Sequence, residues 1–463
     1  MPELPEVTTI IRLLSPSILN KTISKVDVFY KNLIKSDYDI FTNEIINKTI
    51  NSITRTGKFI VFHLSENYRL IVHLRMEGKL FYFKNFRMEN RVDSDSLLFT
   101  FSDNTYLLFN DTRKFGVMYL EKENSETSVL DSVAKDPLQI ETDEEIEKIY
   151  NEIHKKKLPI KESLLNQNII SGLGNIYADE VLFATRISPF KKSNEITLDQ
   201  IKEIIKESKR ILTLAIANNG STVDTYHPAF NEDGNFQNFL KVYGRYGEKC
   251  SVCGTKIEKR FLKGRGTSFC RHCQGIKPSF SITGPIASGK STLLQIFEED
   301  GFVTLSLDKL VRVKYSDKTY IKECAKKFPA IVKNDALDLV KLQALLINNP
   351  SFKRDYQNFL YPQLKEMVNN FLNDNYDKYV AVEVPLLFEA RMNNLFTYNI
   401  GIISKNQEEF LANRGEKHVK EKLELNKNLL FFKHLQDLDL LIKNDGTYEN
   451  LKETIEQFIN FHK

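Results

Sequence analysis

Residues 280–297 read FSITGPIASGKSTLLQIF: an apolar run, a glycine-containing loop, and a second run with apolar residues at helical spacing. The loop and the start of the following run hold a phosphate-binding pattern, made of Gly284, Gly289, Lys290, Ser291 and Thr292. In a strand–loop–helix setting, glycines let backbone N–H groups surround phosphate oxygens at the helix N-terminus. The lysine reaches the β- and γ-phosphates, and the serine hydroxyl can ligate magnesium. The stretch therefore predicts a P-loop that binds the phosphates of a nucleotide together with Mg²⁺.

Downstream of this loop, strand-like and helix-like runs alternate to the end of the chain. VAVEVPLLF (380–388) and YNIGIIS (398–404) are short and almost wholly apolar, as expected for strands buried on both faces. Alternation of this kind is typical of a parallel sheet covered by helices. Residues 279–463 are therefore predicted to form one α/β domain.

Directly upstream lies a cysteine unit, in which two C-x2-C pairs are separated by sixteen residues: Cys250, Cys253, Cys270 and Cys273. Four thiolates at this spacing can converge on one zinc ion, which would replace the core that so short a segment lacks. The alternative is a redox C-x-x-C, which would not need a second copy. The sequence predicts one structural Zn²⁺ in residues 246–275.

Positive charge is concentrated around these cysteines. Residues 241–278 carry a net charge of +8, whereas residues 1–240 carry about −4 and residues 279–463 are neutral. The stretch between the two cysteine pairs reads as a hairpin that bears Lys256, Lys259, Arg260, Lys263, Arg265 and the aromatic Phe269. Such a finger is suited to a nucleic-acid groove, although a solvated basic segment is the simpler alternative.

The first 245 residues divide into two blocks. Short alternating apolar runs between about 22 and 120 predict a β-sandwich or barrel, assigned here to residues 1–130. Residues 143–156, 173–186 and 197–217 show helical spacing and place a helical domain at 131–245. The fold class is therefore multidomain: a β-sandwich, a helical domain with a zinc finger, and an α/β P-loop domain.

Composition excludes several classes of protein. Of 463 residues, 41% are hydrophobic and 27% charged, which is typical of folded domains and not of extended disorder. No apolar stretch reaches membrane-spanning length, and the N-terminus MPELPEVTTI lacks the basic and apolar regions of a signal peptide. We expect a cytoplasmic protein that does not contact a membrane.

The N-terminal PELPEV gains a reactive group if Met1 is removed. Pro2 would then present a secondary amine beside the carboxylates of Glu3 and Glu6. An α-amino group has a pKa near ~8, so part of it is unprotonated at neutral pH and can attack an electrophilic sugar carbon to form an iminium. An ordinary surface turn is the alternative interpretation.

Seven motifs in this order resemble formamidopyrimidine-DNA glycosylase. They are PELPEV, RTGKF (55–59), HLRMEGKL (73–80), DTRKFG (111–116), SGLGNIYADEVLF (171–183), VYGRYGEKC (242–250) and GRGTSFCRHC (264–273). The resemblance covers residues 1 to about 275. It implies excision of oxidised purines such as formamidopyrimidine and 8-oxoguanine from double-stranded DNA, followed by β,δ-elimination at the abasic site.

By motif match, the resemblance also implies roles for individual residues. Pro2 would be the Schiff-base nucleophile, Glu3 the acid, Lys58 the proton donor in β-elimination and Arg265 the donor in δ-elimination. The gap left by the flipped base would be filled from two loops by Met76, Arg113 and Phe115. The kinked phosphate backbone would be held by Lys156, Lys161 and Asn175.

The second resemblance covers residues 281 to about 460 and concerns dephospho-CoA kinase. It is carried by the P-loop, LSLDKLVR (305–312), LYP (360–362), VPLLFE (384–389), Arg414 and IKNDG (442–446). It implies ATP-dependent phosphorylation of the ribose 3′-hydroxyl of dephospho-CoA, with Asp308 as base or substrate-orienting carboxylate and Arg414 on the lid. A helix N-cap is the alternative role for Asp308.

This second half departs from the family pattern. Ser306 replaces the first acid of a D-x-D pair, Tyr361 replaces a histidine, and the lid segment lacks an arginine one turn before Arg414. Phosphoryl transfer depends on positioned cations around the γ-phosphate, so the departures predict a slower kinase or a nucleotide-binding relic.

The sequence as a whole predicts a fusion of a DNA glycosylase/lyase with a kinase of coenzyme A biosynthesis. Two alternatives remain open at this stage. In one, the C-terminal half is a silent nucleotide-binding module; in the other, the N-terminal half binds damaged DNA without chemistry. The expected partners are damaged DNA, ATP and dephospho-CoA.

Overall fold

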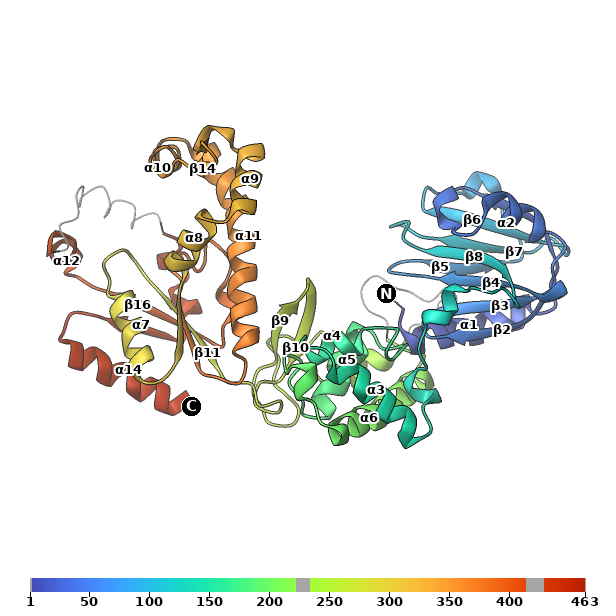
Figure 1. Ribbon diagram of the computed structural model, residues 1–463, viewed down its shortest axis with the longest axis horizontal. Coiled ribbons are helices and arrows are strands. Elements are labelled where there is room, and N and C mark those ends of the chain that lie inside the picture. Colours follow the sequence, from blue (N-terminus) through green and yellow to red (C-terminus); the bar gives the residue numbers. More distant parts are fainter. Residues whose placement is uncertain (1, 222–233, 414–428, 463) are drawn as a thin grey trace. The chain divides into compact units, whose positions relative to one another are not determined.

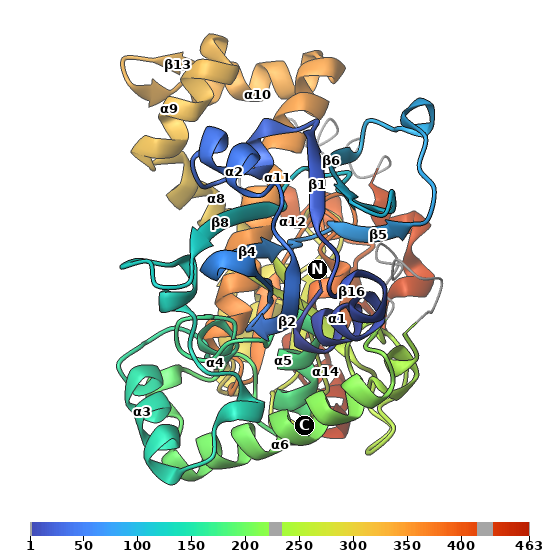
Figure 2. The same ribbon diagram turned by 90° about the vertical axis from the view of Figure 1, so that its right-hand side faces the viewer.

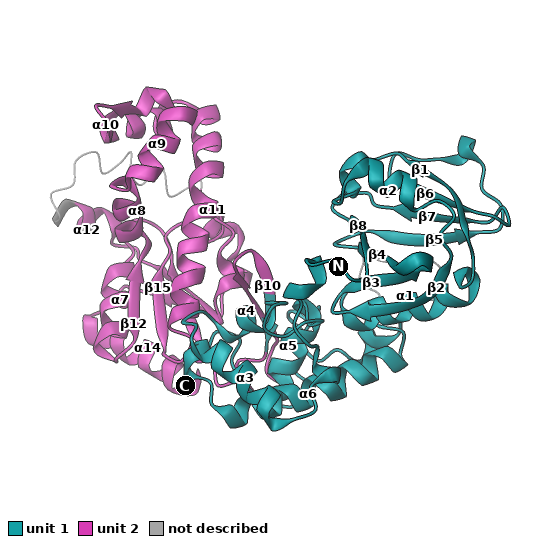
Figure 3. Cartoon of the chain, turned by 45° about the vertical axis from the view of Figure 1, so that its right-hand side comes forward, with its two compact units in different colours: residues 1–254, 267–269 teal, residues 255–266, 270–463 magenta. Residues whose placement is uncertain are grey.

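The computed structural model describes residues 2–221, 234–413 and 429–462. The chain divides into two compact units, which Figure 3 shows in teal and magenta. The first unit comprises residues 1–254 and 267–269, and the second comprises residues 255–266 and 270–463. The division passes through the cysteine segment, so part of this segment belongs to each unit.

The first unit begins with helix α1 (Leu4–Ile18) and two four-stranded antiparallel sheets, in the orders β1-β6-β7-β5 and β2-β3-β4-β8. Side chains of α1 and of both sheets form one hydrophobic cluster. The strands are β1 (Ile23–Val28), β2 (Ile50–Thr56), β3 (Phe59–Leu64), β4 (Tyr68–His73), β5 (Lys79–Phe83), β6 (Asp95–Phe101), β7 (Tyr106–Asn110) and β8 (Val117–Lys122); the short helix α2 (Tyr38–Glu44) follows β1.

The helical part of this unit has a separate hydrophobic cluster. Its members come mainly from four helices: α3 (Asp143–His154), α4 (Ile160–Leu164), α5 (Asn175–Ala184) and α6 (Leu198–Ala217). Thr197 caps α6 by accepting a hydrogen bond from the backbone N–H of Gln200 at 3.2 Å. The three helices expected from helical spacing are therefore present.

Helix α1 connects these two clusters. Leu4 packs into the helical cluster, whereas Val7, Ile10 and Leu14 belong to the sheet cluster. Figure 2 shows α1 between strand β2 and helix α6, both of which it contacts. Residues 2 and 3 therefore lie where the β part and the helical part meet.

The second unit is built on a five-stranded parallel sheet in the order β12-β15-β11-β16-β17. The strands are β11 (Ser279–Thr283), β12 (Val303–Ser306), β15 (Val380–Glu383), β16 (Tyr398–Ile403) and β17 (Leu440–Lys443). Strand β15 is shorter than VAVEVPLLF suggested, because Pro385 has no backbone N–H to donate to a ladder. The predicted parallel α/β sheet is confirmed.

Helices cover both faces of this sheet (Figure 1). One face packs against α7 (Lys290–Glu299) and α14 (Tyr448–His462), and the other packs against α8 (Leu307–Tyr315) and the long α11 (Pro350–Asp374). The remaining elements are α9 (Lys318–Lys327), the two-residue strands β13 (Val332–Lys333) and β14 (Ala336–Leu337), α10 (Leu339–Asn348) and α12 (Gln407–Asn413). None of the helices in the described residues is long and apolar enough to span a bilayer.

Between the cysteine pairs, β9 (Glu258–Leu262) and β10 (Arg265–Phe269) form the predicted hairpin. Its two-residue turn is Lys263–Gly264, with φ angles of 45° and 76°. Positive φ at both central positions matches the turn to the natural twist of the strands.

Candidate active sites and metal centre

Glu3 is bound at the N-terminus of helix α5. One of its carboxylate oxygens accepts a hydrogen bond from the backbone N–H of Gly174 at 2.6 Å, and the other accepts one from Ile176 at 2.9 Å. Gly174, the N-cap residue of α5, has no side chain that could cap the helix, so Glu3 acts as the cap from a distant part of the chain. The helix N-terminus favours the negative charge.

Two glycines make this contact sterically possible. A Cβ atom on Gly174 would lie 2.3 Å from Cδ of Glu3, and one on Gly172 would lie 2.6 Å from Cδ1 of Leu4. The backbone N–H of Leu4 also donates to the carbonyl of Gly172 at 3.1 Å. The SGLG segment therefore holds residues 3 and 4 against the helical part at a separation that side chains would forbid.

A second buried acid, Glu6, is hydrogen-bonded to the same part of the chain. Glu6 accepts hydrogen bonds from the backbone N–H of Glu3 at 2.9 Å, from the hydroxyl of Tyr177 at 2.6 Å and from the N–H of Ser221 at 2.8 Å. Pro2 is buried beside these residues. Glu6 was expected beside Glu3, but Tyr177 was not predicted as a site residue; its position in SGLGNIYADEVLF was the available signal.

Electrostatics link Lys58 to this site. Burial raises the pKa of Glu3, the positive charge of Lys58 opposes this rise, and the charge of Glu6 adds to it. Burial also lowers the pKa of His73 to about 3, with further lowering from Arg75 and Lys58. The fold therefore brings Lys58, in the turn before β3, within electrostatic reach of Glu3, which is 55 positions earlier.

The residues predicted to fill the DNA gap lie on two loops of the first unit. The side chains of Met76 and Phe115 are 39% and 53% exposed, and Arg113 is also exposed. The guanidinium carbon of Arg113 lies 5.0 Å from the centre of the Phe115 ring. A hydrogen bond from Thr112 to Glu77 connects the two loops.

Asp111 shapes the second of these loops. Its carboxylate accepts hydrogen bonds from the backbone N–H groups of Arg113 at 3.0 Å, Phe115 at 2.9 Å and Gly116 at 2.7 Å. Lys114, between them, has a φ of 55°, which this network stabilises. Asp111 belongs to the DTRKFG motif but was not predicted as a site residue.

The three residues expected to hold the phosphate backbone are in different environments. Lys156 is half-buried just after α3, and Asn175 is the first residue of α5, with its side chain hydrogen-bonded to Tyr243. Lys161 is fully buried in an ion pair, with Nζ 2.7 Å from Asp179 Oδ1 and 2.9 Å from Thr267 Oγ1. An ammonium group without exposed surface does not fit the expected role as a phosphate contact.

The four cysteines converge on one point. Their Sγ atoms all lie within 4.8 Å of one another, with Cys250 and Cys270 buried and Cys253 and Cys273 partly exposed. Four thiolates at this separation fit tetrahedral zinc. Two finger residues differ from the expectation: Arg260 is 1% exposed, and Phe269 is buried with its ring edge-on to Phe190 at 5.1 Å. Neither residue lies on a surface that could face a groove.

The predicted P-loop follows β11 and ends at helix α7. A Cβ on Gly284 would lie 2.1 Å from the carbonyl oxygen of Ile402, and one on Gly289 would lie 2.2 Å from Nδ2 of Asn444. Both glycines have positive φ. Nζ of Lys290 donates to the carbonyl of Pro285 at 2.6 Å across the loop, and Thr292 is half-buried in the first turn of α7.

Several polar side chains, among them candidate site residues, lie at the carboxyl edge of the parallel sheet. Ser291 Oγ donates to Glu383 Oε1 at 3.2 Å, and Asn444 Nδ2 donates to the carbonyl of Ser288 at 3.0 Å. Asp308 is exposed in the first turn of α8, just after β12. Ligands of open α/β sheets bind at this edge. Glu383 was not predicted, although an acid that ends the buried run VAVE was a usable signal.

Arg414 lies outside the described residues. Tyr361, the replacement for the expected histidine, lies on α11, and burial raises its pKa to about 12. Its hydroxyl accepts a hydrogen bond from Nε2 of Gln357 at 2.7 Å.

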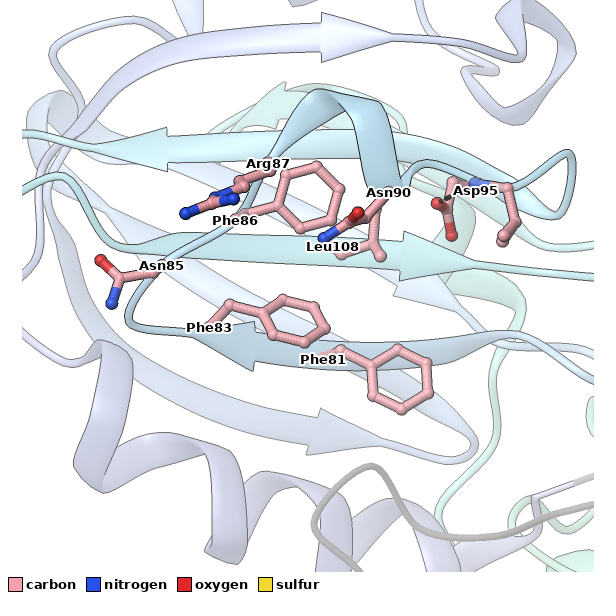
Figure 4. Close-up of a pocket in the computed structure, with 9 residues that line it drawn as sticks. Phe81, Phe83, Asn85, Phe86, Arg87, Asn90, Asp95 and Leu108 are labelled. Carbon is pink, nitrogen blue, oxygen red and sulfur yellow. Dashed lines mark hydrogen bonds between the residues drawn. The ribbon is translucent and has the colours of Figure 1, made fainter.

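A separate pocket of about 420 Å³ lies on the sheet that contains β5, β6 and β7. Figure 4 shows the rings of Phe81 and Phe83 on one strand of this pocket, with Phe86 and Asn90 across from them and Asp95 beyond Asn90. Asp95 accepts hydrogen bonds from Val92 and Asn110, and so ties down the loop before β6. None of the site residues predicted from the sequence lines this pocket.

Four family models match the chain. They are the formamidopyrimidine-DNA glycosylase N-terminal domain (residues 1–118), the H2TH domain of the same glycosylases (133–227), the zinc finger found in FPG and IleRS (247–275), and dephospho-CoA kinase (279–447). The first three follow one another over the part of the chain that contains Glu3, the exposed loops and the cysteines. The fourth covers the P-loop and the parallel sheet.

Whole-protein relatives match the N-terminal part. The formamidopyrimidine-DNA glycosylase of Lactobacillus helveticus is 41% identical over 278 residues, and the match covers 60% of this chain and 99% of the relative. That of Mycoplasma mobile is 42% identical, with 59% and 99% covered. A crystal structure of Lactococcus lactis Fpg in complex with DNA containing an abasic site has a TM-score of 0.53 and 34% identity, covering 59% of this chain and 99% of that one.

Proposed function

The chain belongs to the formamidopyrimidine-DNA glycosylase family and continues into a dephospho-CoA kinase domain, and on that premise we propose how its residues perform two reactions. The N-terminal part excises oxidised purines from double-stranded DNA and cleaves the abasic strand. The C-terminal part transfers the γ-phosphoryl group of ATP to the 3′-hydroxyl of dephospho-CoA. Both substrates lie in the bacterial cytoplasm, which is where we place the protein.

In the first reaction, the Pro2 nitrogen, made available by removal of Met1, attacks C1′ of the damaged nucleotide, and the bond from C1′ to the base breaks. The base leaves with the electron pair of that bond and takes up the proton that the Pro2 nitrogen loses. Glu3 donates a proton as the sugar ring opens, which leaves an iminium between C1′ and Pro2. The raised pKa of Glu3 supports this role, because a larger fraction of the acid then carries, near neutral pH, the proton that it donates.

Two further residues act on the sugar–phosphate strand after the base has left. Lys58, electrostatically coupled to Glu3, assists β-elimination, and Arg265, at the start of β10, assists δ-elimination. Met76, Arg113 and Phe115 occupy the space of the extruded base from the two connected loops. Lys156 and Asn175 remain in the proposed DNA-contact set, and Lys161 is left out because of its burial. We propose that the two sheets around these loops form a β-sandwich over their shared core.

The observation that carries this proposal is the binding of Glu3 at the N-terminus of α5, which fixes Pro2 beside two acids. Borohydride reduction of a reaction with an 8-oxoguanine duplex tests it, because only an iminium becomes covalently fixed. The mature protein should yield a trapped protein–DNA adduct. The matched control is the same chain with one extra residue before Pro2, which makes the nitrogen an amide. It should bind the duplex but yield no adduct; equal trapping by this control would show that another amine is the nucleophile.

In the second reaction, the backbone N–H groups between Gly284 and Gly289 hold the ATP phosphates, and Lys290 neutralises the β- and γ-oxygens. Ser291 and Glu383, 3.2 Å apart, fit a magnesium ion, which would neutralise charge that develops on the phosphates. Asp308 faces solvent at the same sheet edge, where it would orient the accepting 3′-hydroxyl or take its proton. Thr292 and Arg414 complete the proposed ATP contacts.

A second candidate function is nucleotide binding without transfer. Tyr361 favours it, because the side chain of tyrosine cannot carry the positive charge that a histidine could supply at this position. Formation of CoA from dephospho-CoA, ATP and Mg²⁺ by the full-length chain decides between the two. Product that disappears in Lys290→Ala supports the kinase, whereas ATP binding without product in the intact protein supports the alternative.

A further inference from the structure

Strand β9 of the finger lies beside helix α11 (Figure 1), and asparagine side chains of α11 are hydrogen-bonded to the outer edge of β9. The backbone N–H of Phe261 donates to Asn369 Oδ1 at 3.0 Å. Its carbonyl accepts from Asn369 Nδ2 at 2.7 Å and from Asn373 Nδ2 at 2.9 Å. The two asparagines are one helical turn apart, and each is 5% exposed. Their amides therefore occupy the position that a neighbouring strand would take.

The hairpin geometry explains why this edge is available. In a two-residue hairpin, Leu262 and Arg265 flank the turn, so the next pair is Phe261 and Gly266. That pair is of the non-hydrogen-bonded kind, and the N–H and carbonyl of Phe261 point away from β10. An unpaired backbone group costs free energy when buried, so this edge needs the partners that α11 supplies.

Arg260 adds a buried charge to the same junction. Its guanidinium donates to the carbonyl of Leu372 at 3.2 Å and to the hydroxyl of Ser279 at 3.4 Å, and lies 4.0 Å from Glu258. A buried guanidinium is tolerated only where such partners are present. Leu372 is near the end of α11 and Ser279 begins β11, so the finger strand is joined to both elements.

A third set of contacts reaches strand β16. Glu258 accepts a hydrogen bond from the hydroxyl of Thr397 at 3.1 Å, and Arg271 donates to the hydroxyl of Tyr398 at 3.1 Å. Helix α11 itself runs on into the main core, where Tyr356, Leu360 and Leu364 are buried. The finger strand is thus bonded to elements at the centre of the P-loop unit.

We propose that the zinc-finger hairpin is a structural part of the kinase unit, so that zinc binding by the finger stabilises the end of α11 and the start of β11. The four cysteines flank β9 and β10 and fix the hairpin when zinc is bound. The folded kinase unit therefore begins in the finger near residue 255 and not after it at residue 279. The finger thus has a structural role in the second unit in addition to its role in DNA recognition.

Hydrogen exchange on the full-length chain, with and without removal of zinc by a chelator, tests this proposal. We expect zinc removal to accelerate exchange at least about tenfold in residues 369–375 and in β11, as well as in residues 250–273. Acceleration confined to residues 250–273 would overturn the proposal. This measurement involves neither catalytic reaction, so it remains valid if the proposed function fails.

Variants test whether the effect of zinc depends on the contacts between β9 and α11 or on a general loss of stability. In Asn369→Ala/Asn373→Ala, the end of α11 should exchange faster with zinc bound, and zinc removal should change it less than twofold. Asn358→Ala, an exposed position on the same helix, is the matched control and should behave as wild type. Arg260→Met should reproduce the double variant, whereas Lys259→Met, on the exposed face of β9, should not. Equal behaviour of a variant and its control would contradict the proposed junction.

Discussion

The buried pair Lys161–Asp179 yields a prediction that separates a structural role from DNA binding. Both side chains are fully buried, and the two charged atoms are 2.7 Å apart. In Lys161→Met, the carboxylate of Asp179 keeps the N–H of Ser268 as a partner but loses its counter-charge. Removing one partner of a buried pair typically costs about 3–5 kcal/mol of folding free energy. A pure phosphate contact would instead lower the salt dependence of DNA binding by about one charge and leave stability unchanged.

The pH dependence of the stability lost in Lys161→Met provides a second test, because the direction of the change with pH can be predicted. Burial raises the pKa of Asp179 from 3.8 to about 6, while Lys161 opposes the rise. Between these values the folded chain binds more protons than the unfolded chain. The stability that this group contributes is therefore full below pH 3.8 and is lost as the pH rises to 6, by about 3 kcal/mol. Without Lys161, the pKa rises further, so the deficit of the variant should be largest at pH 7 and should shrink towards pH 4.

Both effects can be measured by urea unfolding that is monitored through hydrogen exchange in α5. This probe reports on the first unit separately from the second. Lys161→Met/Asp179→Leu should recover most of the lost stability, because it removes both buried charges. Lys156→Met is the matched control: this lysine is half-buried, so its loss should leave stability unchanged and weaken DNA binding at low salt. A stable Lys161→Met protein with weakened DNA binding would refute the structural role.

Three further predictions concern the two catalytic sites. Gly174→Ala places a methyl group 2.3 Å from Glu3 Cδ, so trapping of the iminium should fall at least about 100-fold while zinc content, measured by a colorimetric chelator, stays the same. Asp111→Ala frees three N–H groups of the Phe115 loop, and binding of an abasic duplex, measured by fluorescence anisotropy, should weaken about tenfold with intact duplex unaffected. Glu383→Gln should raise the Mg²⁺ concentration needed for half-maximal CoA formation several-fold, and an unchanged requirement would remove Glu383 from the metal site.

Local patterns in the sequence were sufficient to predict the main elements and the metal centre. The P-loop, the cysteine spacing and the alternating strands each depend on residues within one turn or one hairpin, and the structure contains all of them. Element ends were predicted less well. Strand β15 stops at Glu383, because the proline two residues later cannot continue a ladder.

Long-range pairing could not be predicted from one sequence. Lys161 and Arg260 were counted as cations for DNA, yet each is buried against a partner far along the chain: Thr267 for Lys161, and Leu372 for Arg260. The positive charge of a lysine or arginine does not indicate whether the residue is buried, because the sequence does not show whether its partner is a phosphate or a carbonyl group. The family motifs placed the catalytic candidates, but only the fold shows what holds them.

The two sites use the same physical device in opposite ways. Helices α5 and α7 both begin after a glycine N-cap without a capping side chain, at Gly174 and Gly289. The free N–H groups of a helix N-terminus attract an anion. At α5 the anion is Glu3 of the chain itself. Its carboxylate occupies the helix N-terminus, and this contact fixes the positions of Glu3 and of Pro2 beside it. At α7 the N-cap residue, Gly289, has no side chain, and in the proposed function the N–H groups that follow it bind the phosphates of a nucleotide. A capping carboxylate introduced near Gly289 should therefore compete with ATP, whereas removal of Glu3 should leave α5 able to bind a small anion.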